Sequence, residues 1–123
     1  MKAQAFPRLL RLRKSSDIDL VLRRGLKASA GHLKCSYMPL HPKQTWPQVA
    51  FVTSRRQLRL AVQRNRLRRL MREAFRLERH HLHTPGLALV FRFVGPLPVS
   101  LHTLRSLMRI IFEHIDSNCN RES

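Results

Sequence analysis

The sequence predicts a single folded domain of the α+β or α/β class with a small sheet. A length of 123 residues is typical of one domain, and 43% apolar side chains suffice for a modest core. Segments with helical periodicity alternate with segments typical of strands, in the order helix, two strands, helix, strand, helix. We expect the domain to span residues 1–123, with flexible termini at about 1–7 and 117–123.

The first predicted helix covers residues 16–24, within "SSDIDLVLRRG". Ser16 is positioned to cap its N-terminus, because Asp19 follows three residues later in the pattern of a capping box. Gly25 marks its end, since glycine is the residue most often found just after a helix. The apolar side chains between these signals share one face, so we expect a short helix that packs on a sheet.

The strands are predicted from alternation and residue type. "HLKCSYM" alternates apolar and polar side chains, and "QVAFVTS" is rich in valine and phenylalanine, with the proline-bearing connector "PLHPKQTWP" between them. Further on, "LALVFRFV" has the continuous apolar character of a buried strand. Ser100 then caps a final helix, "LHTLRSLMRIIFEHI", whose apolar residues fall on one face.

The helix between the strands is the most unusual segment. Residues 61–76 read "AVQRNRLRRLMREAFR", and a helix turns by about 100° per residue. On that wheel the apolar side chains share one arc: Leu67, Leu70, Met71, Ala74, Phe75 and Leu77. The neighbouring arc holds arginines and one amide: Asn65, Arg68, Arg69, Arg72, Arg76 and Arg79. We therefore predict a helix that buries one face and presents guanidinium groups on the other.

The charge of the chain indicates a polyanionic partner. Twenty-four Lys and Arg face seven Asp and Glu, which gives a net charge of +17 and a pI near 11.9. Only Glu73 and Glu78 interrupt the arginine-rich helix, whereas an ordinary solvated face mixes charges of both signs. Arginine holds phosphate through two parallel hydrogen bonds and stacks on bases. Nucleic acid is thus the expected partner, and Asn65 adds a donor and an acceptor suited to a sugar or base edge.

Two other classes share this charge. A structural ribosomal or chromatin-like binder has a similar basic helix. A helix that lies on a membrane surface has a similar wheel, but here the strands and the final helix offer its apolar face a core. The absence of a long apolar run predicts a cytoplasmic protein that neither spans nor binds a membrane. Cys35 and Cys119 match neither a disulfide framework nor a zinc motif, so we expect reduced thiols.

No catalytic group is predicted in this chain. A nuclease that uses two metal ions gathers carboxylates around them, but the acids here are scattered. Asp17 and Asp19 point to different sides of a helix. The histidines His80, His81 and His83 are an alternative metal site, but a role at the end of the basic helix is favoured. We predict no metal and no cofactor bound by the protein itself.

The segment "RRQLRLAVQRNRLRRLMREAFR" resembles the signature of a known family, the protein component of bacterial ribonuclease P. That signature is a basic pair, a short spacer, Arg-Asn-Arg, an aliphatic residue, a second basic pair and Arg-Glu-x-Phe-Arg. Weaker similarity extends through "AFPRLLRL", the first helix, "LALVFRF" and the final helix. The resemblance implies an α+β sandwich of order αβββαβα with a left-handed βαβ crossover. It adds a strand near Lys27 to Ala30.

The resemblance also implies a function. The family's protein binds a large catalytic RNA, and the complex removes the 5′ leader from precursor tRNA. The RNA performs the cleavage, so Mg²⁺ is expected with the RNA subunit and no obligate protein partner is implied. Transferred to this chain, the RNA-binding residues are Arg55, Arg56, Arg59, Arg64, Asn65, Arg66, Arg68, Arg69, Arg72 and Arg76.

A second surface implied by the resemblance is a cleft for the leader between the first helix and the sheet. The family usually has aromatic residues at the positions of Ile18 and Leu22, which are aliphatic here, so stacking on these side chains is excluded. Tyr37 and Phe51 are the alternative rings, with a core position as the competing interpretation for Phe51. The nearby cations Arg23, Arg24 and Lys34 are candidates for the charge of the cleft.

Overall fold

The computed structural model describes residues 10–40, 44–54, 56 and 58–121. Its elements in chain order are α1 (Ser15–Arg24), β1 (Leu26–Ala30), β2 (Leu33–Pro39), β3 (Gln48–Val52), α2 (Ala61–Glu78), the 3₁₀ turn η2 (Arg79–His81), β4 (Leu87–Phe93) and α3 (Leu101–Arg121). The order αβββαβα is therefore confirmed, as is the additional strand near Lys27 to Ala30. The predicted terminus 1–7 lies outside the described residues.

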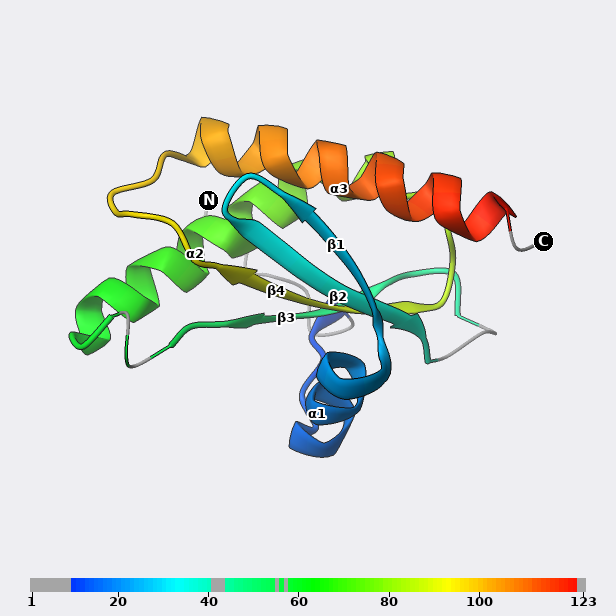
Figure 1. The fold of residues 1–123 in the computed structure, drawn as a ribbon, viewed down its shortest axis with the longest axis horizontal. Helices are drawn as coiled ribbons and strands as arrows, with labels where there is room; N and C mark the ends of the chain where they lie inside the picture. The colour runs from blue at the N-terminus through cyan, green and yellow to red at the C-terminus, as the bar shows by residue number, and fades with distance from the viewer. Residues whose placement is uncertain (1–9, 41–43, 55, 57, 122–123) are drawn as a thin grey trace, which may run out of the picture.

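The strands form one sheet of four in the order β1-β2-β4-β3. β2 pairs antiparallel with β1 and with β4, whereas β3 pairs parallel with β4. Parallel neighbours need a crossover connection, and α2 supplies it between β3 and β4. The left hand of this crossover stays a prediction from the resemblance. In Figure 1, α2 and α3 lie on one side of the sheet and α1 on the other.

The larger core lies between the sheet and the pair α2 and α3. Because side chains alternate along a strand, every second residue of β2, β3 and β4 enters this layer. Phe91 of β4 is central, since its ring centroid lies 5.9 Å from Phe51, 6.1 Å from Phe75 and 6.2 Å from Phe112. Aromatic side chains from two strands and two helices thus hold α2 at a fixed position on the sheet.

A smaller cluster lies on the opposite face of the sheet. Leu12, Val21, Ala88 and Val90 are buried there, with Ile18 packed against them. The segment before α1 runs beside β3, where the Leu12 amide donates to the Val49 carbonyl at 2.9 Å. α1 covers only part of this face, and the rest of it carries polar and charged side chains such as Lys34 and Arg92.

The ends of α1 differ in part from the prediction. α1 begins at Ser15 and its N-cap is Lys14, whose φ of −70° and ψ of 126° are extended as an N-cap requires. No side-chain cap bond forms there, so the predicted cap by Ser16 was wrong. Gly25 does end the helix, and a Cβ at this position would lie 2.4 Å from the Val21 carbonyl oxygen. Glycine is needed because the backbone approaches so closely.

The final helix is longer than the sequence indicated. Ser100 caps it as predicted, since its Oγ accepts the Thr103 N–H at 3.1 Å. The helix then continues to Arg121, so residues 117–121 are helical where a flexible terminus was expected. Asn118 Nδ2 donates to the Tyr37 hydroxyl at 2.9 Å, and Cys119 packs against the larger core. These contacts hold the last turns of α3 on the sheet.

Two further features bear on function. Among the described residues, no helix is long and apolar enough to cross a membrane. Cys35 is buried, and this burial raises the pKa of its thiol, so the sulfur stays protonated at neutral pH.

Candidate nucleic-acid interface

The two faces of α2 are as predicted. Leu67, Met71, Ala74 and Phe75 are buried, and Leu70 is half-buried against the same core. The arginines point away from it, with Arg66, Arg69 and Arg72 exposed and Arg64, Arg68 and Arg76 half-buried. We call Arg68, Arg69 and Arg72, together with Arg11 from the segment before α1, the arginine face.

Arg64 is bound to the chain before α2. Its Nη1 donates to the carbonyl oxygen of Leu58 at 2.7 Å and to that of Arg59 at 3.0 Å. The guanidinium therefore closes the loop that leads into the helix. Arg59 and Arg56 are exposed in that loop, whereas Arg55 lies outside the described residues.

Arg68 is held in place by two neighbours. Its Nη1 donates to Thr53 Oγ1 at 3.1 Å, just beyond the end of β3, and its Nη2 donates to Asn65 Oδ1. Asn65 thus positions an arginine, a role the sequence did not indicate. The amide nitrogen takes no part in this bond, so contact between Asn65 and RNA stays a prediction.

Arg72 lies among like charges. Although its side chain is largely exposed, partial desolvation by the surrounding chain lowers its pKa, and the charges of Arg11, Arg68 and Arg69 lower it further. Arg11 Nε is itself buried and has no hydrogen-bond partner within the part of the chain that the structure describes. Three guanidinium groups therefore repel that of Arg72, and an anion would relieve this repulsion.

Arg11 was not among the RNA-binding residues predicted from the sequence. Its neighbours Leu10 and Leu12 are buried, and a bridge to Val49 places Arg11 beside β3. The alternation of Leu and Arg in "LLRLR" is the signal that indicates an extended segment with basic side chains on one side.

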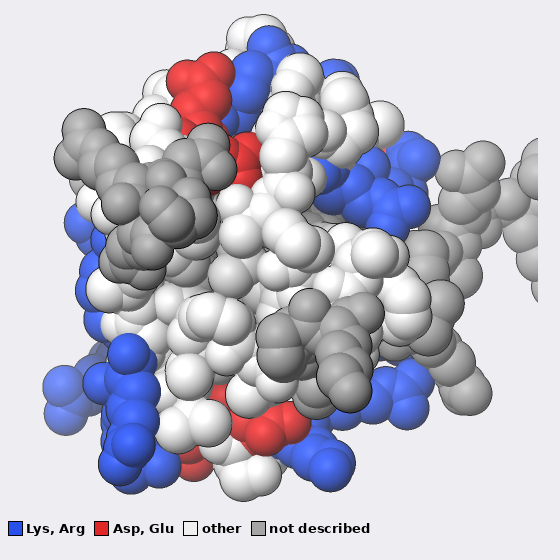
Figure 2. All heavy atoms as spheres, turned by 90° about the vertical axis from the view of Figure 1, so that its right-hand side faces the viewer, with Lys and Arg blue, Asp and Glu red and all other residues white. Residues whose placement is uncertain are grey.

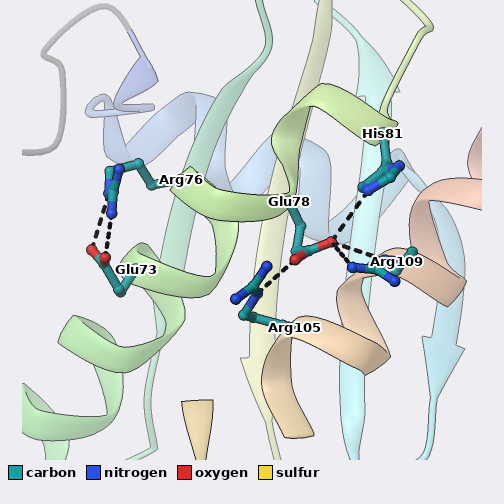
Figure 3. Close-up of polar contacts among 6 residues, drawn as sticks. All are labelled: Glu73, Arg76, Glu78, His81, Arg105 and Arg109. Carbon is teal, nitrogen blue, oxygen red and sulfur yellow. Dashed lines mark hydrogen bonds and ion pairs between the residues drawn. The ribbon is translucent and has the colours of Figure 1, made fainter. Parts of the chain in front are cut away.

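The two acids of α2 have different roles. Glu73 forms an ion pair with Arg76 on the helix surface, whereas Glu78 is buried and turned toward α3 (Figure 3). Glu78 accepts from Arg105 Nε at 2.6 Å and from Arg109 Nε at 2.9 Å. Burial alone raises the pKa of Glu78, but these hydrogen bonds outweigh it and lower the pKa. Glu78 therefore joins α2 to α3. The prediction that Glu78 interrupts the arginine-rich surface was wrong, because its carboxylate is buried against α3.

The histidines after α2 make local contacts. The ring centroids of His80 and His81 are 4.1 Å apart, and His81 Nε2 lies 3.5 Å from Glu78 Oε1. His83 Nδ1 lies 3.3 Å from Asp116 Oδ2 of α3. In the described parts of the chain, no three His, Cys, Asp or Glu side chains gather as metal ligands would.

A second basic surface is a groove of about 520 Å³ between α1 and the open part of the sheet, which we call the α1 groove. Lys34 of β2 and Arg92 of β4 are directly opposite one another in the sheet register and both line the groove. Like charges in such a pair destabilise a sheet. Lys27 Nζ adds a third cation, donating to the Leu22 carbonyl at 2.6 Å and to Ser36 Oγ at 2.7 Å. The groove is therefore suited to an anion.

The predicted cleft residues separate into two pairs. Leu22 is 38% exposed and lines the α1 groove, whereas Ile18 packs against the smaller cluster. Tyr37 and Phe51 lie on the opposite face of the sheet, in the larger core. Tyr37 is only 2% exposed and bonded to Asn118. The proposal that these two rings line the cleft is thus corrected, because strand parity turns both away from α1.

The charge of the groove also differs from the prediction. Of the expected cations, Lys34 lines the groove, but Arg23 and Arg24 are exposed on α1 outside it. Lys27 and Arg92 were missed. Arg92 is the single charged residue in "LALVFRF", and a charge inside an apolar strand signals a face that is not covered.

Comparison with known proteins identifies the family. A family model described as "Ribonuclease P" matches residues 6–116. The chain belongs to the ribonuclease P family. It is 40% identical over 83 residues to the ribonuclease P protein component of Chromohalobacter salexigens, a match that spans 67% of this chain and 63% of that protein. It is 32% identical over 102 residues to that of Methylococcus capsulatus, across 83% of this chain and 78% of the relative.

A solved structure shows the same fold. The RNase P protein from Thermotoga maritima matches with a TM-score of 0.71 at 21% identity, across 84% of this chain and 96% of that chain. The small mixed sheet between α1 and the pair α2 and α3 is thus the ribonuclease P protein fold.

The two basic surfaces lie over different parts of this ribonuclease P fold. The arginine face borders β3, because Arg11 lies beside Val49 and Arg68 bonds to Thr53. The α1 groove extends toward β1, which is the opposite edge of the sheet. Figure 2 views the end that is on the right in Figure 1, where white atoms fill the centre and Lys and Arg atoms lie around it.

Proposed function

We propose that this chain is the protein subunit of ribonuclease P. It binds the catalytic RNA through the arginine face and the 5′ leader of precursor tRNA through the α1 groove. The complex then removes the leader by endonucleolytic cleavage. The observation that carries the proposal is the arginine face, which gathers the guanidinium groups of α2 and of Arg11 on one surface in a chain of this family.

RNA is a suitable partner for the arginine face. Each guanidinium can bind a phosphate through two hydrogen bonds, and a polyanion relieves the repulsion among these side chains. Arg68 is pre-organised by Thr53 and Asn65, so little side-chain entropy is lost when it binds. Arg69 and Arg72 are exposed on the same surface. Most of the affinity is then electrostatic and depends on salt.

A single-stranded leader suits the α1 groove. Lys34 and Arg92 supply the charge for phosphates, and the exposed side chain of Leu22 supplies apolar contact for bases. No aromatic residue of the described chain lines this groove. The groove therefore distinguishes a leader by its charge and length more than by its base sequence.

Catalysis belongs to the RNA in this proposal. Glu73 and Glu78 are paired with arginines, and Asp116 accepts hydrogen bonds from the backbone of His83 and Thr84. These carboxylates serve the fold and are not gathered around an ion. Magnesium then acts with the RNA subunit, and the protein works in the cytoplasm, where precursor tRNA is processed.

The test is a cleavage assay with three samples: RNA-free protein, a bacterial ribonuclease P RNA, and both together. Near physiological magnesium, the mixture should cleave precursor tRNA much faster than the RNA alone, because the protein offsets phosphate repulsion. The protein alone should be inactive. Cleavage by the protein alone contradicts a catalytic RNA. Tight RNA binding without any stimulation indicates instead a structural, ribosomal-type RNA-binding protein.

A further inference from the structure

We infer that a second leader subsite lies between β1 and the C-terminal half of α3 and binds the base of a leader nucleotide. It takes a nucleotide farther from the cleavage site than those in the α1 groove. This inference rests on the proposed function, since it extends the path of the same leader.

The subsite is a separate hollow of about 410 Å³. Tyr37 lines it from the sheet, and His114, Ser117 and Asn118 line it from α3. In Figure 1, this half of α3 passes beside β1 and β2 toward the C-terminus. The hydrogen bond between Asn118 and the Tyr37 hydroxyl holds two of these groups in place.

The hollow and the α1 groove adjoin the same stretch of chain. Lys27, Ala28 and Ser29 of β1 line both of them. β1 is an edge strand, so no other strand blocks the way from one face of the sheet to the other at this point. A single strand of RNA that leaves the groove over Lys27 therefore enters the hollow beside α3.

The chemistry of the two hollows is different. The α1 groove carries Lys34 and Arg92, whereas the hollow beyond β1 is lined by hydroxyl, amide and imidazole groups, with Lys27 shared between them. Neutral donors and acceptors match base edges and the 2′-hydroxyl, and an imidazole ring can stack on a base. The groove thus suits phosphates and the second hollow suits a base.

The position of the catalytic RNA gives the direction of the strand. The arginine face borders β3, and the sheet order places β1 at the far edge. A leader that starts at the catalytic RNA crosses the α1 groove first and reaches β1 last. The hollow therefore receives the more distant nucleotide.

The experiment measures the affinity of precursor tRNA for the protein–RNA complex, under conditions that block cleavage, with leaders lengthened one nucleotide at a time. His114→Ala is the main variant, because His114 is exposed and its removal leaves the core intact. Ser117→Ala is a second variant. His102→Ala is the matched control, an exposed histidine near the other end of the same helix.

For the unmodified protein we expect affinity to rise in two steps as the leader grows. His114→Ala should remove the second step, a loss of about fivefold or more, while Lys34→Ala should lower the first. An abasic nucleotide at the second-step position should weaken binding to the unmodified protein and leave binding to His114→Ala unchanged. If His114→Ala and Ser117→Ala both behave like His102→Ala at every length, the subsite does not exist, although the first step still supports the α1 groove. If affinity ignores leader length altogether, both the groove and the subsite are wrong.

Discussion

Replacing arginines of α2 one at a time should separate those that bind RNA from those that hold the loop. Among the residues that the structure describes, Arg69 and Arg72 donate no side-chain hydrogen bond, whereas Arg64 donates to the Leu58 and Arg59 carbonyls. Arg72→Ala should therefore weaken RNA binding without loss of stability. Arg64→Ala should lower the free energy of unfolding by about 1 kcal/mol, since the lost hydrogen bonds are partly exposed to water.

The size of the RNA effect follows from counterion release. Each phosphate contact contributes about 0.7 to 0.9 to the slope of log affinity against log salt. Between about 50 and 200 mM salt, one contact therefore accounts for roughly a threefold change in affinity. At low salt, Arg72→Ala should bind the RNA more weakly than the unmodified protein does. When the salt is raised over this range, the affinity of the variant should fall by a factor about threefold smaller than that of the unmodified protein.

The assay is filter binding or fluorescence anisotropy with ribonuclease P RNA at several salt concentrations, together with thermal unfolding of the free protein. Arg64→Ala should lower the melting temperature by roughly 3 to 6 °C. Arg72→Ala should melt at or above the unmodified value, because it relieves repulsion from Arg11, Arg68 and Arg69. An unchanged salt slope for Arg72→Ala, with a lower melting temperature, would show that the arginine face is structural and would refute the reasoning.

Three further predictions use other parts of the molecule. Glu78→Gln should lower the free energy of unfolding by about 2 kcal/mol at neutral pH. This is less than the loss expected on breaking a fully buried ion pair, because the arginine partners of Glu78 are partly exposed. Glu73→Gln, the control, should melt near the temperature of the unmodified protein. The pKa of Glu78 is lowered in the folded state. Urea unfolding should therefore show the full difference in stability between the unmodified protein and Glu78→Gln above the ordinary carboxyl pKa. The difference should shrink as the pH falls through the folded pKa. Lys34→Gln should slightly raise the melting temperature, by removing a like-charge pair, yet weaken binding of leader-bearing precursor relative to mature tRNA. Leu22→Phe should tighten precursor binding by about fivefold or more if the ring stacks on a leader base, and equal gains for mature tRNA would contradict this.

Much of the fold was predictable because local residue patterns determine most of its helices and strands. The apolar residues of α2 recur with helical spacing, and Leu67, Met71 and Phe75 are buried as that spacing requires. Glycine and proline mark the ends of elements, so the order of helices and strands followed. The strand at Leu26–Ala30 was expected only through the resemblance, since "LKASA" is short and weakly apolar.

The arginine-rich surface was also predictable, because one helix carries most of it and a helical wheel depends on sequence alone. Its details were not. Arg11 joins Arg72 from a segment distant in the sequence, and the ion pairs of Glu78 depend on where α3 packs. Contacts between elements of this kind depend on the packing angle and register of each element, which no single segment encodes.

The sequence by itself determined the charge, the order of all the helices and strands except β1, and the two faces of α2. Only the tertiary structure decided which face of the sheet became core and which became groove. Side chains alternate along β2, so Tyr37 and Lys34 lie on opposite faces of the sheet. This alternation does not determine which of the two faces a helix will cover. Because α2 and α3 pack on the side of Phe91, Tyr37 is buried beneath α3, and Lys34 lies with Arg92 in the α1 groove.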